Sequence, residues 1–167
     1  QIPASGITEE DRSMIKGEAL FLRGYQYFLL VNNYKEVPLR LIPSNEDETN
    51  KGPASEAALW TQVEEDLGNA IKCNLPIERT TAKERVTKGA AIAMLGKVYA
   101  TQHKYPEAKQ LLVSLLSAPY SYELVDDFAK NFTNEEEFNK ESVYEIAYSP
   151  DGEYSWSNES GICLGCY

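Results

Sequence analysis

Hydrophobic residues recur at helical spacing between residues 9 and 34. Thr8 is a suitable N-cap, with Asp11 three residues further on, and Pro38 limits the helix at its far end. At about 100° per residue, the large apolar side chains form two adjacent stripes. One stripe holds Phe21, Tyr25 and Phe28, and the other holds Leu20, Tyr27, Val31 and Tyr34. The pattern predicts one long helix, residues 9–34, that contacts at least two neighbours.

A polar stretch, residues 42–53, contains Pro and Gly and is predicted to be a loop. A second helix is predicted over residues 55–73, with Ser55 as its cap. Its core face consists of Leu59, Val63, Leu67 and Ala70. Its acidic residues Glu64, Glu65 and Asp66 are expected to be solvated.

Residues 86–100 are rich in Gly and Ala, which lets a partner helix approach closely. Two starts for this third helix are open, because Thr81 makes a capping box with Glu84 and Thr87 is also a suitable cap. A fourth helix is predicted over residues 106–117, with proline in its first turn, where the missing N–H costs nothing. The third helix is expected to cover residues 87–102.

Regularity fades after Tyr120. Residues 143–148 (VYEIAY) have the β-branched and aromatic content of a short strand. Residues 149–167 are rich in Gly, Ser and aromatic residues and are expected to be loop.

The third and fourth helices follow the tetratricopeptide pattern, in which a Leu-Gly pair, a Tyr and an Ala recur at fixed places. The matching residues are Ile92, Leu95, Gly96, Tyr99, Ala108, Leu112 and Pro119. The first pair matches more loosely, through Leu20, Gly24, Tyr27, Val63, Leu67, Ala70 and Pro76. We therefore predict a mainly α fold of stacked helical hairpins, with the aromatic helix buried between its own partner and the next hairpin. At most a short strand is expected, near residues 143–148.

The chain of 167 residues is acidic, with a formal charge of −10. Such a surface repels phosphate groups, so binding to nucleic acid or to anionic lipid is not expected. No apolar run is long enough to span a bilayer, and we expect no signal peptide within these residues. Because the chain begins with Gln1, we expect any targeting segment to have been removed or to lie upstream.

Reactive residues are few. Cys73 stands alone, and Cys163 and Cys166 form a single CxxC that we interpret as a short disulfide or as two idle thiols. His103 is expected at the turn between the third and fourth helices, far in sequence from any cysteine, so no zinc site is predicted. The carboxylates cluster in loops and on exposed faces rather than as the pair that a glycosidase needs. We expect no cofactor, no metal and no enzymatic activity.

The segment EALFLRGYQYFLLVNNYKEVPL, residues 18–39, resembles the hallmark segment of the SusD/RagB family, bacterial outer-membrane lipoproteins for nutrient binding. That family typically has a Glu-Ala-x-Phe-Leu-Arg-Ala-x-x-Tyr-Phe-x-Leu-Val run followed by Gly-x-Val-Pro-Leu. Here Gly24 replaces the usual alanine, and Lys35 and Glu36 replace the glycine-containing turn. Further segments are similar to the family, namely WTQVEEDLGNAIKCNLP, RVTKGAAIAMLGKVYA, YELVDDFAKNF and ESVYEIAYS. The likeness extends from about Gln1 to Ser149.

The resemblance implies that residues 1–149 are the early part of a SusD-like helical region of tetratricopeptide type, and that residues 150–167 begin a loop-rich region. It implies a lipid-anchored protein of the outer-membrane surface whose anchor lies outside this chain. Such a protein binds an oligosaccharide or a peptide and passes it to a TonB-dependent transporter of the SusC type. The alternative is a tetratricopeptide scaffold that binds a protein partner without a small ligand.

Three residues of the tail are the candidate ligand-binding residues. Tyr154, Trp156 and Asn158 alternate with small polar residues in a Gly/Ser-rich stretch. An aromatic ring stacks on the apolar face of a sugar, and an amide bonds its hydroxyls. The competing interpretation is that Trp156 only packs the loop onto the helices. Arg23, on an otherwise apolar helix, is expected to bond a carboxylate or backbone carbonyls rather than a ligand.

Overall fold

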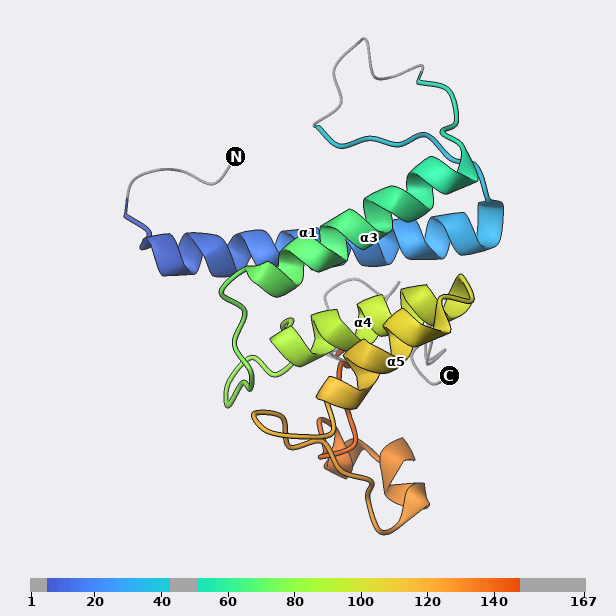
Figure 1. The fold of residues 1–167 in the computed structure, drawn as a ribbon. Coiled ribbons are helices and arrows are strands. Elements are labelled where there is room, and N and C mark those ends of the chain that lie inside the picture. Colours follow the sequence, from blue (N-terminus) through green and yellow to red (C-terminus); the bar gives the residue numbers. More distant parts are fainter. Residues whose placement is uncertain (1–5, 43–50, 148–167) are drawn as a thin grey trace, which may run out of the picture.

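The computed structural model describes residues 6–42 and 51–147, which form two antiparallel helical hairpins in two layers (Figure 1). The upper hairpin pairs α1 (Glu9–Tyr34) with α3 (Glu56–Lys72), and the lower one pairs α4 (Lys88–Thr101) with α5 (Tyr105–Ser114). Two short 3₁₀ helices, η1 (Phe128–Phe132) and η2 (Asn134–Glu136), lie beyond α5. The stacked-hairpin prediction is confirmed.

Side-chain caps define where three of the helices begin. The hydroxyls of Thr8, Ser55 and Thr87 each accept a hydrogen bond from the backbone N–H three residues further on. Thr87 therefore begins the third helix, and Thr81 lies in the preceding loop. The fourth helix ends earlier than predicted, at Ser114, and residues 115–119 form turns.

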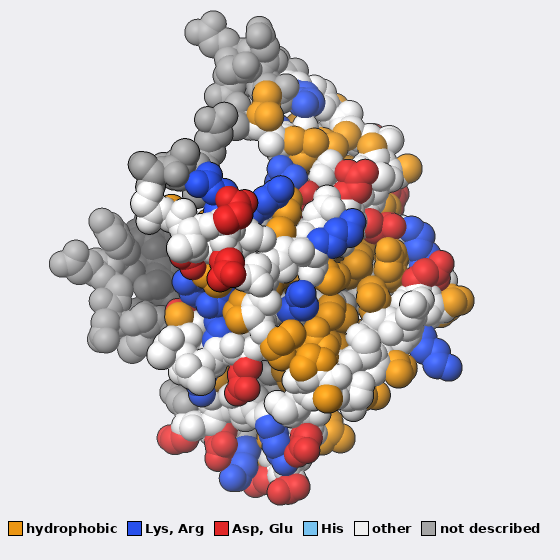
Figure 2. All heavy atoms as spheres, turned by 60° about the vertical axis from the view of Figure 1, so that its left-hand side comes forward, with side chains coloured by type: hydrophobic (Ala, Val, Ile, Leu, Met, Phe, Trp, Pro, Cys, Tyr) orange, Lys and Arg blue, Asp and Glu red, His pale blue; other side chains and the backbone are white. Residues whose placement is uncertain are grey.

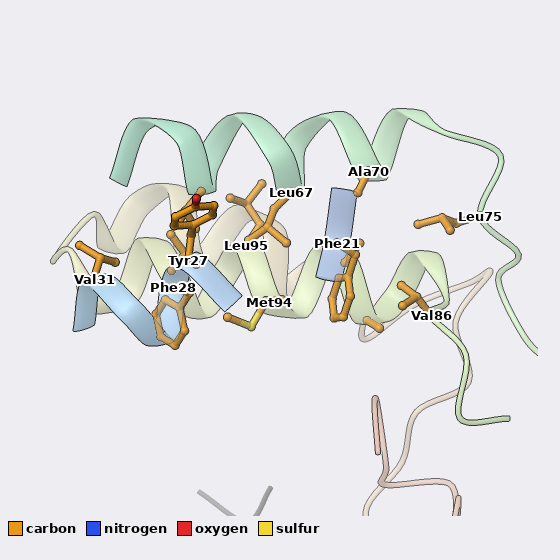
Figure 3. Packing of buried hydrophobic residues seen from close by; sticks show 14 of the residues in the cluster. Phe21, Tyr27, Phe28, Val31, Leu67, Ala70, Leu75, Val86, Met94 and Leu95 are labelled. Atoms are coloured by element: carbon orange, nitrogen blue, oxygen red, sulfur yellow. The ribbon is translucent and has the colours of Figure 1, made fainter. Parts of the chain in front are cut away.

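The core lies between α1, α3 and α4. Figure 3 shows Tyr27 and Phe28 of α1, Leu67 of α3, and Met94 and Leu95 of α4 meeting in one cluster. Helix α4 is buried on most of its surface because it packs against both α3 and α5. Each large apolar side chain removed from water in this way contributes about 1.5–3 kcal/mol to folding.

Two glycines of the repeat pattern lie at helix crossings. A Cβ added at Gly24 would lie 3.0 Å from Cγ of Leu67, and one added at Gly96 would lie 2.7 Å from Cδ2 of Leu112. A larger side chain at either position would push its partner helix away. The expected close approach of the helices is thereby confirmed.

Two expectations are wrong. Asp66 was expected to be solvated, but it is 1% exposed because it pairs with Arg23. Tyr34 was expected on an apolar stripe of its helix, but it is 69% exposed because it is the last residue of α1. The prediction allowed at most a short strand near residues 143–148, and the described residues 143–147 contain none; Tyr148 lies outside the described part.

Candidate functional site

Helix α1 supplies polar side chains that hold loops in place. Arg23 donates to Asp66 through Nε and Nη2, at 2.7 and 2.6 Å, and Nη1 donates to the carbonyl of Leu41 at 3.3 Å. The Tyr27 hydroxyl accepts from the backbone N–H of Arg40 at 2.7 Å and donates to its carbonyl at 3.1 Å. Arg23 therefore bonds a carboxylate and a carbonyl, as predicted, and both α1 residues fix the segment that follows the helix.

Glu18 of α1 anchors the loop between α3 and α4. Its carboxylate bonds Arg79, and it also accepts from Nη2 of Arg85 at 2.6 Å. Arg79 in turn donates to the carbonyl of Val86, so the loop is tied at both of its ends. The Arg79 side chain is 10% exposed, and burial lowers the pKa of its guanidinium from the ordinary value. This anchored loop forms one wall of a pocket.

The pocket, which we call the loop pocket, has a volume of about 320 Å³ and lies between three segments. They are the loop before α4 (residues 77–87), the turn after α5 (residues 119–122) and the segment 138–145. All three are connections rather than helices, and loops on a rigid scaffold are where binding residues concentrate. The volume lies at the lower end of the range for small-molecule sites.

Tyrosines form the apolar walls of the loop pocket. The rings of Tyr120 and Tyr122 stack with centroids 6.1 Å apart and planes 12° from parallel. Tyr144 packs edge-on against Phe21 of α1, with ring centroids 5.1 Å apart. Burial raises the pKa of both Tyr120 and Tyr144, so both phenols stay neutral near pH 7.

Gly89 explains the position of Tyr122. A Cβ at residue 89 would meet the Tyr122 hydroxyl and would lie 3.0 Å from Cζ of its ring. The missing side chain lets the ring lie directly against the first turn of α4. Gly89 therefore fixes one wall of the pocket.

Internal bonds also hold the third segment. The Asn139 side-chain oxygen accepts from the backbone N–H groups of Glu141 and Ser142, at 2.8 and 3.3 Å. Glu145 accepts from the backbone N–H of Phe138 at 3.0 Å. These bonds preform the segment without using the Ser142 hydroxyl.

Charged side chains of both signs are interspersed on the face drawn in Figure 2, although the whole chain carries −10. Around the loop pocket, Arg79 pairs with Glu18, and Lys140 bonds Glu123 at 3.3 Å. The remaining basic residue of the lining, Lys83, is exposed. The buried cation is therefore already neutralised.

A shallower groove lies near the other end of α4, beside Trp60. The Trp60 ring packs edge-on against Phe28, with centroids 6.0 Å apart, and its Nε1 donates to Glu56 at 3.2 Å. Nearby, Glu64 accepts from Gln102 at 2.8 Å and from Lys104 at 2.5 Å. The prediction that Trp60 packs in the helix core is confirmed, and its polar neighbours bond one another.

The predicted ligand-binding residues Tyr154, Trp156 and Asn158 lie outside the described residues, as do Cys163 and Cys166. Of the described residues shortly before that segment, 143–145 line the loop pocket. The pocket's own tyrosines were not singled out from the sequence. The sequence signal that could have indicated them is Tyr-Ser-Tyr after Pro119, in which two aromatic residues stand two positions apart just beyond the end of a predicted helix.

Neither a metal site nor a membrane-spanning helix is found in residues 6–42 and 51–147. No three Cys, His, Asp or Glu residues there are grouped so that they could hold a metal ion. No helix in these ranges combines the length and the apolar character needed to cross a bilayer. His103 lies at the α4–α5 turn, as expected, with Nδ1 2.8 Å from the Tyr105 hydroxyl.

These features define the class as stacked tetratricopeptide-like hairpins, with three connecting segments gathered around the loop pocket. A SusD-like family model, described as starch-binding and associating with the outer membrane, matches residues 2–100. The chain belongs to the SusD-like family. No curated protein matches it.

Solved structures of this family superpose well on the chain. A SusD superfamily protein from Bacteroides vulgatus is 38% identical, with a TM-score of 0.77 over 84% of this chain and 30% of its own length. A laminarin-binding SusD-like protein is 35% identical, with a TM-score of 0.84 over 89% of this chain and 34% of its own. NanU of B. fragilis is 25% identical, with a TM-score of 0.77 over 94% of this chain and 33% of its own length. The chain thus spans about a third of the solved structures that it matches.

Proposed function

We propose that this chain is part of a cell-surface subunit that captures oligosaccharide and passes it to a TonB-dependent outer-membrane transporter. The observation that carries the proposal is the family match over residues 2–100, whose description combines starch binding with the outer membrane. The 35% identity to a laminarin-binding protein supports a carbohydrate rather than a peptide ligand. The resemblance to the SusD/RagB lipoproteins further suggests that a lipid anchor holds the intact protein at the membrane.

In this proposal, residues 1–149 form the scaffold and residues 150–167 begin the ligand-binding loops. Tyr154, Trp156 and Asn158 contact the glycan, with Trp156 stacked on a sugar ring and Asn158 bonded to a hydroxyl. The scaffold's role is to hold loops in place, as α1 does for the described loops through Glu18, which bonds Arg85, and Tyr27, which bonds Arg40. The protein binds its ligand without hydrolysing it.

Purification from the outer membrane of the bacterium that makes this protein tests whether it binds a transporter. A tagged intact protein, extracted in mild detergent, is expected to bring down a TonB-dependent transporter in near-equal amount. A deletion strain is expected to lose growth on the cognate glycan while retaining growth on its monosaccharide. If a soluble protein co-purifies instead and growth on every glycan is unchanged, the chain is a protein-binding scaffold and the proposal is wrong.

A further inference from the structure

The loop pocket has the composition of a site for a neutral ligand. A carboxylate, sulfate or phosphate held there would need a buried cation with free bonding capacity. The buried cation of the lining, Arg79, is bonded to Glu18 and to the carbonyl of Val86. Lys140 is exposed and bonds Glu123, and Lys83 is also exposed. Apart from these basic groups and the exposed carboxylate of Glu78, the lining offers mainly aromatic rings and hydroxyls to a ligand.

Aromatic rings beside hydroxyls suit a sugar. A pyranose ring offers an apolar face of C–H groups and a rim of hydroxyls, which need a flat ring and polar partners. The loop pocket places the Tyr120 and Tyr122 rings beside Ser121 and Ser142. Neither serine hydroxyl has a hydrogen-bond partner within the described part of the chain. Its volume of about 320 Å³ has room for a pyranose ring.

The walls of this pocket are already fixed before a ligand arrives. Tyr122 is held against α4 by the absence of a side chain at Gly89, and Tyr144 is held by Phe21. Asn139 fixes its own segment through two backbone N–H groups. A prearranged site loses little conformational entropy on binding, which favours affinity for a weak, neutral ligand.

We propose that the loop pocket is a sugar subsite that binds one neutral pyranose ring of an oligosaccharide, stacked on Tyr120. The inference rests on the proposed function of glycan capture and adds a position and a ligand class to it. Ser121 and Ser142 supply hydrogen bonds at the rim of the ring.

The test measures calorimetric affinity of the intact protein for laminarihexaose, maltohexaose and cellohexaose, with trigalacturonate as the acidic probe. Ser121→Trp fills the pocket from an exposed position, and Ser117→Trp is its matched control, exposed nearby but outside the lining. Tyr120→Ala removes the stacking ring, and Tyr105→Ala is the control at an exposed tyrosine. Melting curves confirm that each variant is folded.

We expect at least one neutral hexasaccharide to bind, and Ser121→Trp and Tyr120→Ala to weaken that binding about tenfold or more. Both controls are expected to stay within about twofold of the wild type. Equal affinity in Ser121→Trp and the wild type overturns the subsite while leaving glycan capture intact. Pocket-dependent binding of trigalacturonate alone overturns the neutral ligand class. Failure of the wild type to bind any probe overturns both the subsite and the proposed function.

Discussion

The buried ion pair between Arg23 and Asp66 offers a sharp test of how α1 is held. Asp66 is 1% exposed and receives two hydrogen bonds from Arg23 and a third from Gln62 at 2.9 Å. Replacing Arg23 with Met removes the guanidinium but keeps a long side chain over the same surface. The Asp66 carboxylate would then remain buried with Gln62 as its only bonded side chain.

The size of the effect follows from the burial of the two partners. Removing one member of a fully buried pair costs about 3–5 kcal/mol, because the other charge is left without compensation. The Arg23 side chain is 34% exposed, so water can take part of its place, and we expect about 2–3 kcal/mol for Arg23→Met. Replacing both residues, in Arg23→Met with Asp66→Leu, removes both charges and is expected to cost less than about 1.5 kcal/mol.

The coupling energy between Arg23 and Asp66 is measured by urea unfolding of four proteins: the wild type, the two single variants and the double variant. The hydrogen bond to Asp66 raises the pKa of Arg23, so the guanidinium stays charged at any pH used. A neutral pH therefore suffices. A cost below about 1 kcal/mol for Arg23→Met, or single-variant costs that simply add in the double variant, would refute the reasoning.

Four further outcomes are expected. Gly96→Leu should lower the free energy of unfolding by a few kcal/mol, because the new side chain would collide with Leu112. His103→Ala should change the free energy of unfolding by about 0.5 kcal/mol or less, and equal melting shifts for the two variants would contradict this expectation. Burial raises the pKa of Tyr144 above 10.0, so the stability that the neutral phenol contributes is present below pH 10 and is lost as the pH rises further. Between pH 8 and 11 the free energy of unfolding, measured by denaturation, should therefore fall less steeply for Tyr144→Phe than for the wild type. Trp156→Ala should weaken glycan binding measured by calorimetry, and unchanged affinity with an intact fold would remove Trp156 from the site. No sugar should be released from any polysaccharide by the intact protein, and release above a buffer blank would show that it is an enzyme.

Local signals in the sequence were enough to predict the helices and their pairing. The caps Thr8 and Ser55 and the glycines at 24 and 96 act within one turn or at one crossing, so their meaning is visible in the sequence. Asp66 shows where such reasoning fails. Three acidic residues in a row are typical of a solvated face, and only the position of Arg23, 43 residues away, makes one of them buried.

The loop pocket depends entirely on tertiary contacts. Its three segments are separated in sequence and are brought together by Glu18 on one side and by Phe21 on another. The composition of residues 143–148 allowed a short strand, and the described residues 143–147 form none for a related reason. Strand-forming composition is a weak preference that needs a partner strand, and Tyr144 instead packs its segment onto α1.

Native mass spectrometry of the intact protein with a panel of oligosaccharides tests the central claim, glycan capture without cleavage, most directly. The account predicts a complex whose added mass equals one whole oligosaccharide of the panel, and recovery of that oligosaccharide unshortened after release. A spectrum with no complex at any concentration, or with shortened products, would contradict it.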